Sequence, residues 1–78
     1  MSPRKRSVRI SGHTTSISME EPFWTLLSRY AEERNLSINA LVAEIDAARI
    51  SSDGIDSNLS SAVRVWVLEE TAKRAGLT

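Results

Sequence analysis

The sequence predicts a small, mostly helical domain with one N-terminal strand, and three observations support this fold class. Residues 13–19 alternate between apolar or β-branched and polar side chains, which is the period of a half-buried strand. Two segments after it carry apolar side chains on one helical face and have residues that start and stop helices. A third helical segment follows a turn-rich loop.

The length of the chain limits how it can be stabilised. It has 78 residues, no cysteine and one histidine. A core of this size supplies only about 3–5 kcal/mol, so short chains often need disulfides, a metal or a second subunit. Disulfides are impossible here, and one histidine without thiolates offers too few ligands for a structural zinc site. That leaves a well-packed monomer or an oligomer, and we expect an oligomer with no metal and no cofactor.

The chain divides into four segments by composition. We predict a flexible basic arm over residues 1–12, a core over residues 13–50, a loop over residues 51–57 and an additional C-terminal helix over residues 58–78.

The strand has two unlike faces. Thr15, Ile17 and Met19 fall on the side predicted to be buried. The polar side carries Thr14, Ser16 and Ser18. A lone strand is not stable, and no second convincing strand follows in the chain. The sequence therefore predicts pairing with the same strand of a second copy.

The first helix opens with acids that complement the helix dipole, and Pro22 is tolerated in its first turn. Asn35 readily adopts the left-handed conformation that stops a helix. Ser37 is the predicted N-cap of a second helix from Ile38 to about Ile50. The third helix is predicted over Leu59–Arg74, with Ser57 or Asn58 as its cap.

These residues resemble the ribbon-helix-helix DNA-binding family over Thr14 to about Arg49. The resemblance rests on Thr15-Ser-Ile-Ser-Met19, on Trp24-x-x-Leu27-x-x-x-Ala31 and on Asn35-Leu-Ser37-x-Asn-x-Leu41. Residues 6–13 and 57–62 also look like a short bacterial subfamily with an extra C-terminal helix. The resemblance implies an intertwined homodimer, in which two chains pair their strands into an antiparallel ribbon above the helices.

The zero net charge hides a division along the chain. Residues 1–18 carry four basic residues and no acid, whereas residues 19–78 carry six basic residues against all ten acids. The balance is therefore +4 before a body of −4. A basic segment before an acidic body predicts contact with an anionic surface, most commonly nucleic-acid phosphate.

A two-stranded ribbon fits the major groove, so the polar strand face is predicted to contact bases through Thr14, Ser16 and Ser18. Such hydroxyls specify bases weakly, and this predicted face has no long basic side chain. The resemblance also places a phosphate at the start of the second helix. The predicted phosphate contacts are Arg4, Lys5, Arg6, Arg9, His13, Ser37, Ile38 and Asn39. The predicted dimer core is Thr15, Ile17, Met19, Trp24, Leu27, Leu41, Val42 and Ile45.

The sequence thus predicts a cytoplasmic, homodimeric transcriptional regulator that binds double-stranded DNA. The alternative is a protein-interaction module or antitoxin-like dimer with weak or no DNA binding, which the zero net charge and the hydroxyl-only face favour. The third helix could then dock a protein partner. No enzyme is predicted, because adjacent acids do not face each other on a helix and the serines have no activating base. No apolar run approaches the roughly 18–20 residues that cross a bilayer.

Overall fold

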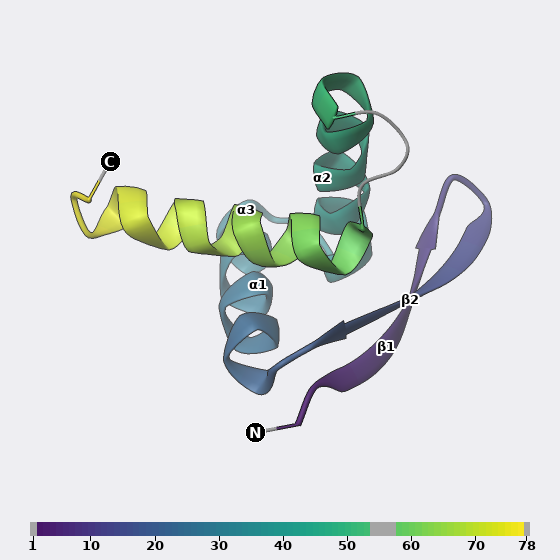
Figure 1. The fold of residues 1–78 in the computed structure, drawn as a ribbon, viewed down its shortest axis with the longest axis horizontal. Coiled ribbons are helices and arrows are strands. Elements are labelled where there is room, and N and C mark those ends of the chain that lie inside the picture. The colour runs from purple at the N-terminus through teal and green to yellow at the C-terminus, as the bar shows by residue number, and fades with distance from the viewer. Residues whose placement is uncertain (1, 54–57, 78) are drawn as a thin grey trace.

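The computed structural model describes residues 2–53 and 58–77, which form a two-stranded antiparallel ribbon followed by three helices (Figure 1). The elements are β1 (Arg4–Ile10), β2 (His13–Met19), α1 (Glu21–Glu33), α2 (Ile38–Asp53) and α3 (Leu59–Arg74). The predicted mostly helical class, with a ribbon and an additional C-terminal helix, is confirmed.

The ribbon has two strands from one chain, where the sequence predicts one strand per chain. β1 occupies residues 4–10, which the sequence assigns to a flexible arm, and it pairs with β2 along its whole length. Ser11 and Gly12 join the strands with φ of 52° and 81°. These two left-handed residues form the type I′ geometry whose twist matches that of paired strands. The strand expected to need a second copy is therefore paired within its own chain, and the homodimer stays a prediction.

The helix boundaries follow local capping. Asn35 has a φ of 57° and ends the turn after α1, as predicted. The Ser37 hydroxyl accepts a hydrogen bond from the Ala40 amide at 3.0 Å and caps α2. Asn58 caps α3 by accepting from the Ser61 amide at 3.2 Å, and α3 has the predicted bounds. α2 runs to Asp53, three residues into the predicted loop, whose residues 54–57 lie outside the described residues.

One side of the ribbon and the three helices enclose a single core. Ile17 and Met19 have no exposed surface, while Thr14 and Ser16 are exposed, so the predicted alternation of β2 is observed. Every residue predicted for the dimer core is buried within this chain except Thr15, which is half-buried. The buried residues are Val8, Ile17, Met19, Trp24, Leu27, Tyr30, Ala31, Leu41, Val42, Ile45, Val63 and Val67.

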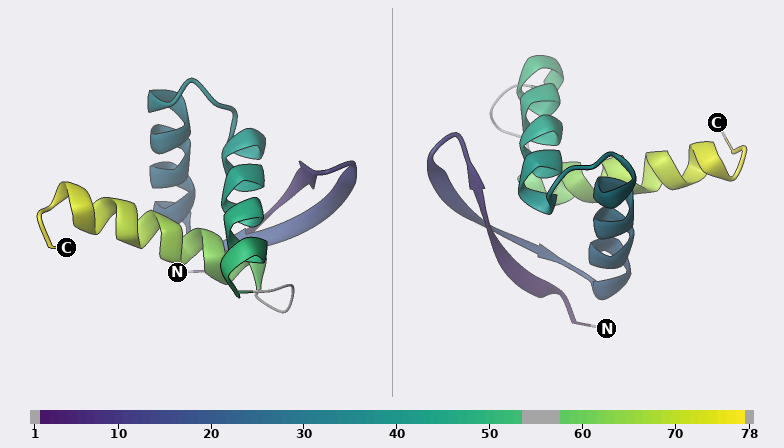
Figure 2. Two further views of the ribbon diagram at one scale, coloured as in Figure 1. Left: turned by 90° about the horizontal axis from the view of Figure 1, so that it is seen from above. Right: turned by 180° about the vertical axis from the view of Figure 1, so that it is seen from behind.

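α3 lies across α1 and α2, and its C-terminal end projects beyond α1 (Figures 1 and 2). Side chains from the second half of α3 contact the last turn of α1. We call this contact the α1–α3 seam. The Tyr30 hydroxyl and the Thr71 hydroxyl are 2.7 Å apart, and the Tyr30 and Trp66 rings meet edge to face at 6.0 Å. The seam consists of Tyr30 and Glu33 of α1 and its C-cap Arg34, together with Trp66, Glu70, Thr71 and Arg74 of α3.

The arginines of the seam are each held by an acid and an aromatic ring. Arg34 lies 5.1 Å from the Trp66 ring centroid and donates to Glu70 at 3.3 Å. Arg74 lies 4.3 Å from the Tyr30 centroid and pairs with both Glu33 and Glu70. These charges connect two helices, whereas adjacent acids such as Glu69-Glu70 look like solvated positions in the sequence.

Candidate nucleic-acid interface

The ribbon has a polar face that points away from the helices. The strand register pairs Lys5 with Ser18, Ser7 with Ser16 and Arg9 with Thr14. Residues directly opposite in an antiparallel pair project on the same face. Five of these side chains are exposed and Ser18 is half-buried. We call this surface the outer face; it consists of Lys5, Ser7, Arg9, Thr14, Ser16 and Ser18, and none of the six is acidic.

The outer face stays exposed because the opposite side of the ribbon packs in the core. The residues that alternate with it include Val8, Ile17 and Met19, which are at most 3% exposed. Turning the ribbon over would expose these side chains and bury two cations. Because a strand has a period of two, a one-residue shift of either strand would likewise move its apolar side chains from the core to the solvent. The polarity of the ribbon is therefore fixed by the packing beneath it.

Lys5 and Arg9 correct the prediction that the base-facing surface carries only hydroxyls. Both belong to β1, which the sequence assigns to a flexible arm, so their direction was not predicted. The signal that could have found them is the two-residue Ser11-Gly12 turn between two alternating segments, which is typical of a hairpin. With the hairpin recognised, counting back from the turn places Arg9 opposite Thr14 and Lys5 opposite Ser18.

The other two cations of β1 face the helix side of the ribbon. Arg4 donates to Glu21 at 3.0 Å, and the Arg6 guanidinium lies 5.0 Å from the centroid of the Trp24 ring. The Trp24 indole in turn donates to the Arg4 carbonyl at 3.0 Å. These contacts join β1 to the first turns of α1. Arg4 and Arg6 therefore lie apart from Lys5 and Arg9, although the sequence predicts all four as phosphate contacts.

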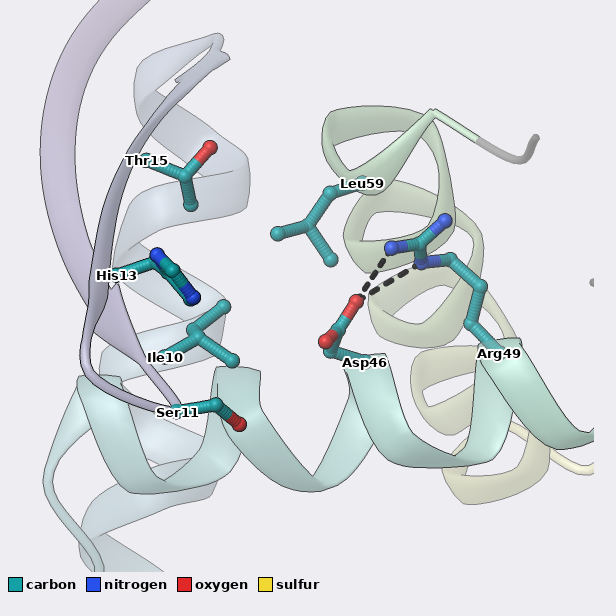
Figure 3. Close-up of a pocket in the computed structure, with 7 residues that line it drawn as sticks. All are labelled: Ile10, Ser11, His13, Thr15, Asp46, Arg49 and Leu59. Atoms are coloured by element: carbon teal, nitrogen blue, oxygen red, sulfur yellow. Dashed lines mark hydrogen bonds and ion pairs between the residues drawn. The ribbon is translucent and has the colours of Figure 1, made fainter. Parts of the chain in front are cut away.

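His13 also lies on the helix side, at the tip of the ribbon. With Ile10 and Thr15 it borders an open pocket of about 410 Å³ between the hairpin and the helices (Figure 3). Across this pocket Asp46 and Arg49 form an ion pair whose side chains are only 14% and 12% exposed. The structure does not bring His13 onto the outer face.

The start of α2 is the remaining predicted phosphate contact. The Ser37 hydroxyl is used as the helix cap, the Ile38 side chain is half-buried against the core, and Asn39 is exposed. Within residues 2–53 and 58–77, no hydrogen bond or ion pair joins these three residues to the ribbon. A phosphate contact at this helix end stays a prediction.

One contact that the sequence did not predict fixes the position of the ribbon. The Ser18 amide donates to the Ser60 hydroxyl at 3.2 Å, so the first turn of α3 holds the last part of β2. Asn58 caps the same turn, and Val63 packs in the core one turn later. The third helix thus supports the ribbon from behind and leaves the outer face open.

A model of the ribbon-helix-helix domain family matches residues 3–71. The chain belongs to this family. A solved structure of an uncharacterized protein from Bordetella pertussis Tohama I is similar, with a TM-score of 0.85 and 27% identity. The match covers 96% of this chain and 60% of that one, so the chain spans less than two thirds of that protein's length. No curated protein matches the chain.

Ribbon-helix-helix domains are in general DNA-binding regulators, and the match includes both strands and most of α3. Among the residues described, none of the helices is long and apolar enough to cross a membrane. The same residues contain no group of three or more side chains suited to hold a metal ion. The outer face of the ribbon is therefore the candidate site that agrees with the family.

Proposed function

We propose that this protein is a transcriptional regulator, not an enzyme, and that it binds double-stranded DNA by placing the outer face of its ribbon in the major groove. The observation that carries the proposal is the composition of that face. It presents two long cations and four hydroxyls, with no acid, from a ribbon whose other side is anchored in the core. A two-stranded ribbon fits a groove about 12 Å wide.

The distribution of charge explains how binding would depend on salt. The body of the chain, residues 19–78, carries six basic residues and ten acids, a net −4, so long-range attraction to DNA is weak. Binding then rests on local contacts by Lys5 and Arg9, supported by the predicted phosphate contact at the start of α2. Such contacts release condensed counterions, so affinity falls steeply as salt rises. In the predicted homodimer, two ribbons would be related by a twofold axis.

The alternative is a protein-interaction module that uses α3. The observation in its favour is a pair of apolar side chains on the outside of that helix, Val65 at 50% and Leu68 at 63% exposure. The argument from a hydroxyl-only ribbon no longer supports it, because Lys5 and Arg9 share the outer face. The DNA-binding function is therefore the better supported of the two.

A fluorescence anisotropy titration with mixed-sequence duplex fragments tests the proposal. We expect binding at about 50 mM salt that weakens by orders of magnitude towards about 200 mM. The variant Val65→Ser/Leu68→Ser keeps the ribbon intact and is expected to bind DNA as the natural sequence does. If the natural protein shows no binding at low salt, the regulator function is wrong. If the natural protein binds DNA and the Val65→Ser/Leu68→Ser variant does not, the DNA interface lies on α3 and not on the ribbon.

A further inference from the structure

α3 carries apolar side chains on two opposite faces. Val63 and Val67 pack in the core and are at most 1% exposed, whereas Val65 and Leu68 are 50% and 63% exposed on the other side. α3 lies across α1 and α2, and none of the described elements covers its outer side (Figures 1 and 2). A helix needs one apolar stripe to pack on a core. The packing within this chain therefore leaves the outer apolar side chains without a role.

The exposed side chains of α3 follow the spacing of a two-helix coiled coil. Ser61, Val65, Leu68 and Ala72 are four, three and four residues apart, so they form one stripe along the outer side of the helix. We call these four residues the α3 stripe. In heptad terms Val65 and Ala72 occupy a positions, while Ser61 and Leu68 occupy d positions. A β-branched residue at a with leucine at d favours two parallel helices.

The charges beside the α3 stripe are complementary to those of a second copy. Arg64 and Glu69 lie on its two sides, at the g and e positions of the same heptad pattern. In a parallel pair, the g residue of one helix faces the e residue that lies five positions later on the other. Arg64 of each copy would thus face Glu69 of the other, and a twofold axis repeats the ion pair. An antiparallel pair would instead bring like charges together.

Both charged side chains are available for such pairing. Among the described residues, neither Arg64 nor Glu69 forms a side-chain hydrogen bond or an ion pair within the chain. Lys73 lies one turn from Glu69 but pairs with Glu70 at 3.8 Å. The charges on the inner side of α3 are used within the chain, as Arg74 with Glu70 shows, whereas those beside the stripe are not.

The length of α3 limits the strength of the contact. The helix has 16 residues, which is about 24 Å at roughly 1.5 Å per residue. Two large apolar side chains per copy bury less than the roughly 1,000 Å² that a stable interface needs. We therefore expect weak, reversible association that becomes stronger where another contact already holds two copies together. The stripe shares no residue with the ribbon, so both surfaces can be used at once.

We propose that the α3 stripe is a self-association surface, on which a second copy of this chain places its own α3 in parallel. This contact is separate from the strand pairing predicted for the homodimer, and it does not depend on the proposed DNA-binding function. Where both contacts form, α3 connects homodimers into a larger assembly.

Sedimentation equilibrium of the full chain without DNA, from micromolar to millimolar concentration, tests the proposal. Leu68→Glu places an acid in the stripe, and the matched control Leu77→Glu changes a leucine outside it that is 77% exposed. Arg64→Glu and Glu69→Arg reverse the flanking charges, and Arg29→Glu reverses an exposed charge on α1 as their control. Circular dichroism establishes that each variant is folded.

We expect the average mass of the natural protein to rise with concentration towards twice that of Leu68→Glu. Leu68→Glu should weaken self-association at least about 100-fold, because both copies lose the central apolar contact. Arg64→Glu and Glu69→Arg should each weaken it by about 3- to 10-fold. An equal mixture of these two variants should associate as the natural protein does, because opposite charges face each other again. Both controls should behave like the natural protein.

Two outcomes overturn the proposal. Equal masses for the natural protein and Leu68→Glu at every concentration would mean that a second copy is not the occupant of the stripe, which would leave a different protein as its partner. An unchanged mass for Arg64→Glu would contradict the parallel order, because an antiparallel pair places Arg64 against Arg64. Neither measurement contains DNA, so a failure here is distinct from a failure of the proposed DNA-binding function.

Discussion

The cations of the outer face and those of the α1–α3 seam differ in what surrounds them. Lys5 and Arg9 have no acid on their face of the ribbon. Among the described residues, their side chains make no hydrogen bond, ion pair or contact with an aromatic ring. Arg34 and Arg74 each pair with Glu70, and each stacks on an aromatic ring of the seam. The same residue types therefore stay exposed and unpaired on the outer face, whereas in the seam they hold α3 on α1.

The difference teaches that net charge is a poor guide to this protein. The acids of the body neutralise cations that hold helices together, and they leave the ribbon's outer cations unbalanced. Because salt screens exposed charges beyond about 10 Å at 0.1 M, distant acids do little to cancel that local field. The following substitutions separate the two regions, beginning with the core that supports the ribbon.

Ile17→Lys should have the largest effect. Ile17 has no exposed surface, so the substitution buries an unpaired ammonium and costs more than about 4 kcal/mol. The domain has only roughly 0.05–0.15 kcal/mol of stability per residue, so the variant should not fold. Thermal denaturation followed by circular dichroism measures this.

Ser16→Lys is the matched control, because Ser16 is the neighbouring residue on the outer face. This variant should melt like the natural protein and bind DNA more tightly at low salt. A cooperative, natural-like melt for Ile17→Lys would show that the two faces of β2 are assigned the wrong way round.

The second test removes two positive charges from one region or the other. Lys5→Ala/Arg9→Ala should lower DNA affinity by about 10- to 100-fold and reduce the slope of log affinity against log salt by about 2. Arg34→Ala/Arg74→Ala removes the same charge from the seam, so it should lower the melting temperature while the salt slope is kept. Anisotropy titrations at several salt concentrations, with melts of both variants, check the pair. Equal loss of DNA affinity in both would mean that only the total charge matters.

The features predicted from sequence are those that local residues determine. The bounds of α3 were predicted because Asn58 and Gly76 act within one turn of its ends. The buried face of β2 was predicted because Ile17 and Met19 alternate with serines. β1 was missed because Arg4, Lys5 and Arg6 have the composition of a disordered arm, and their order depends on pairing with β2.

The seam was missed for a related reason. The hydrogen bonds that join one side of the seam to the other link residues 36 to 41 positions apart, such as Arg34 with Glu70 and Tyr30 with Thr71. Neither helical periodicity nor a capping residue predicts such a contact, because the contact depends on the angle at which α3 crosses α1. For the candidate site, the outward serines and threonine of β2 were predicted, while the direction of Lys5 and Arg9 required the register of the hairpin.

Tyr30→Phe tests the seam without changing its charge. Tyr30 is 3% exposed, and its hydroxyl shares a 2.7 Å hydrogen bond with Thr71. Removing it should cost about 1 kcal/mol and lower the melting temperature by about 4–8 °C, while DNA binding is unchanged. Thr71 retains its 2.8 Å bond to the Val67 carbonyl, so the loss is confined to one interaction. A variant as stable as the natural protein would mean that the tyrosine ring alone holds the seam.

The smallest expected effect is the dependence of the seam on pH. The hydrogen bond from Arg74 holds the pKa of Glu33 below its usual value, against an opposing effect of desolvation. At Glu70 desolvation raises the pKa, but hydrogen bonds and charges from Arg34, Lys73 and Arg74 outweigh it, so that pKa is also lowered. A carboxylate with a lowered folded pKa stabilises the fold above its unfolded pKa and loses that contribution as pH falls through the folded value.

Melting temperatures should therefore hold near neutral pH and decline once the pH drops below about 4.5, the ordinary range for a glutamate. Glu33→Gln/Glu70→Gln should lower the melting temperature at pH 7 and flatten the decline, because the variant has fewer carboxylates to protonate. Glu32→Gln/Glu69→Gln, at neighbouring exposed positions, should keep the natural profile. If both pairs of substitutions gave the same profile, the acid dependence would come from the general charge of the body. Such an outcome would erase the contrast between the paired charges of the seam and the unpaired charges of the ribbon. A difference confined to Glu33 and Glu70 would instead place the pH sensitivity in the seam and leave the outer face of the ribbon independent of it.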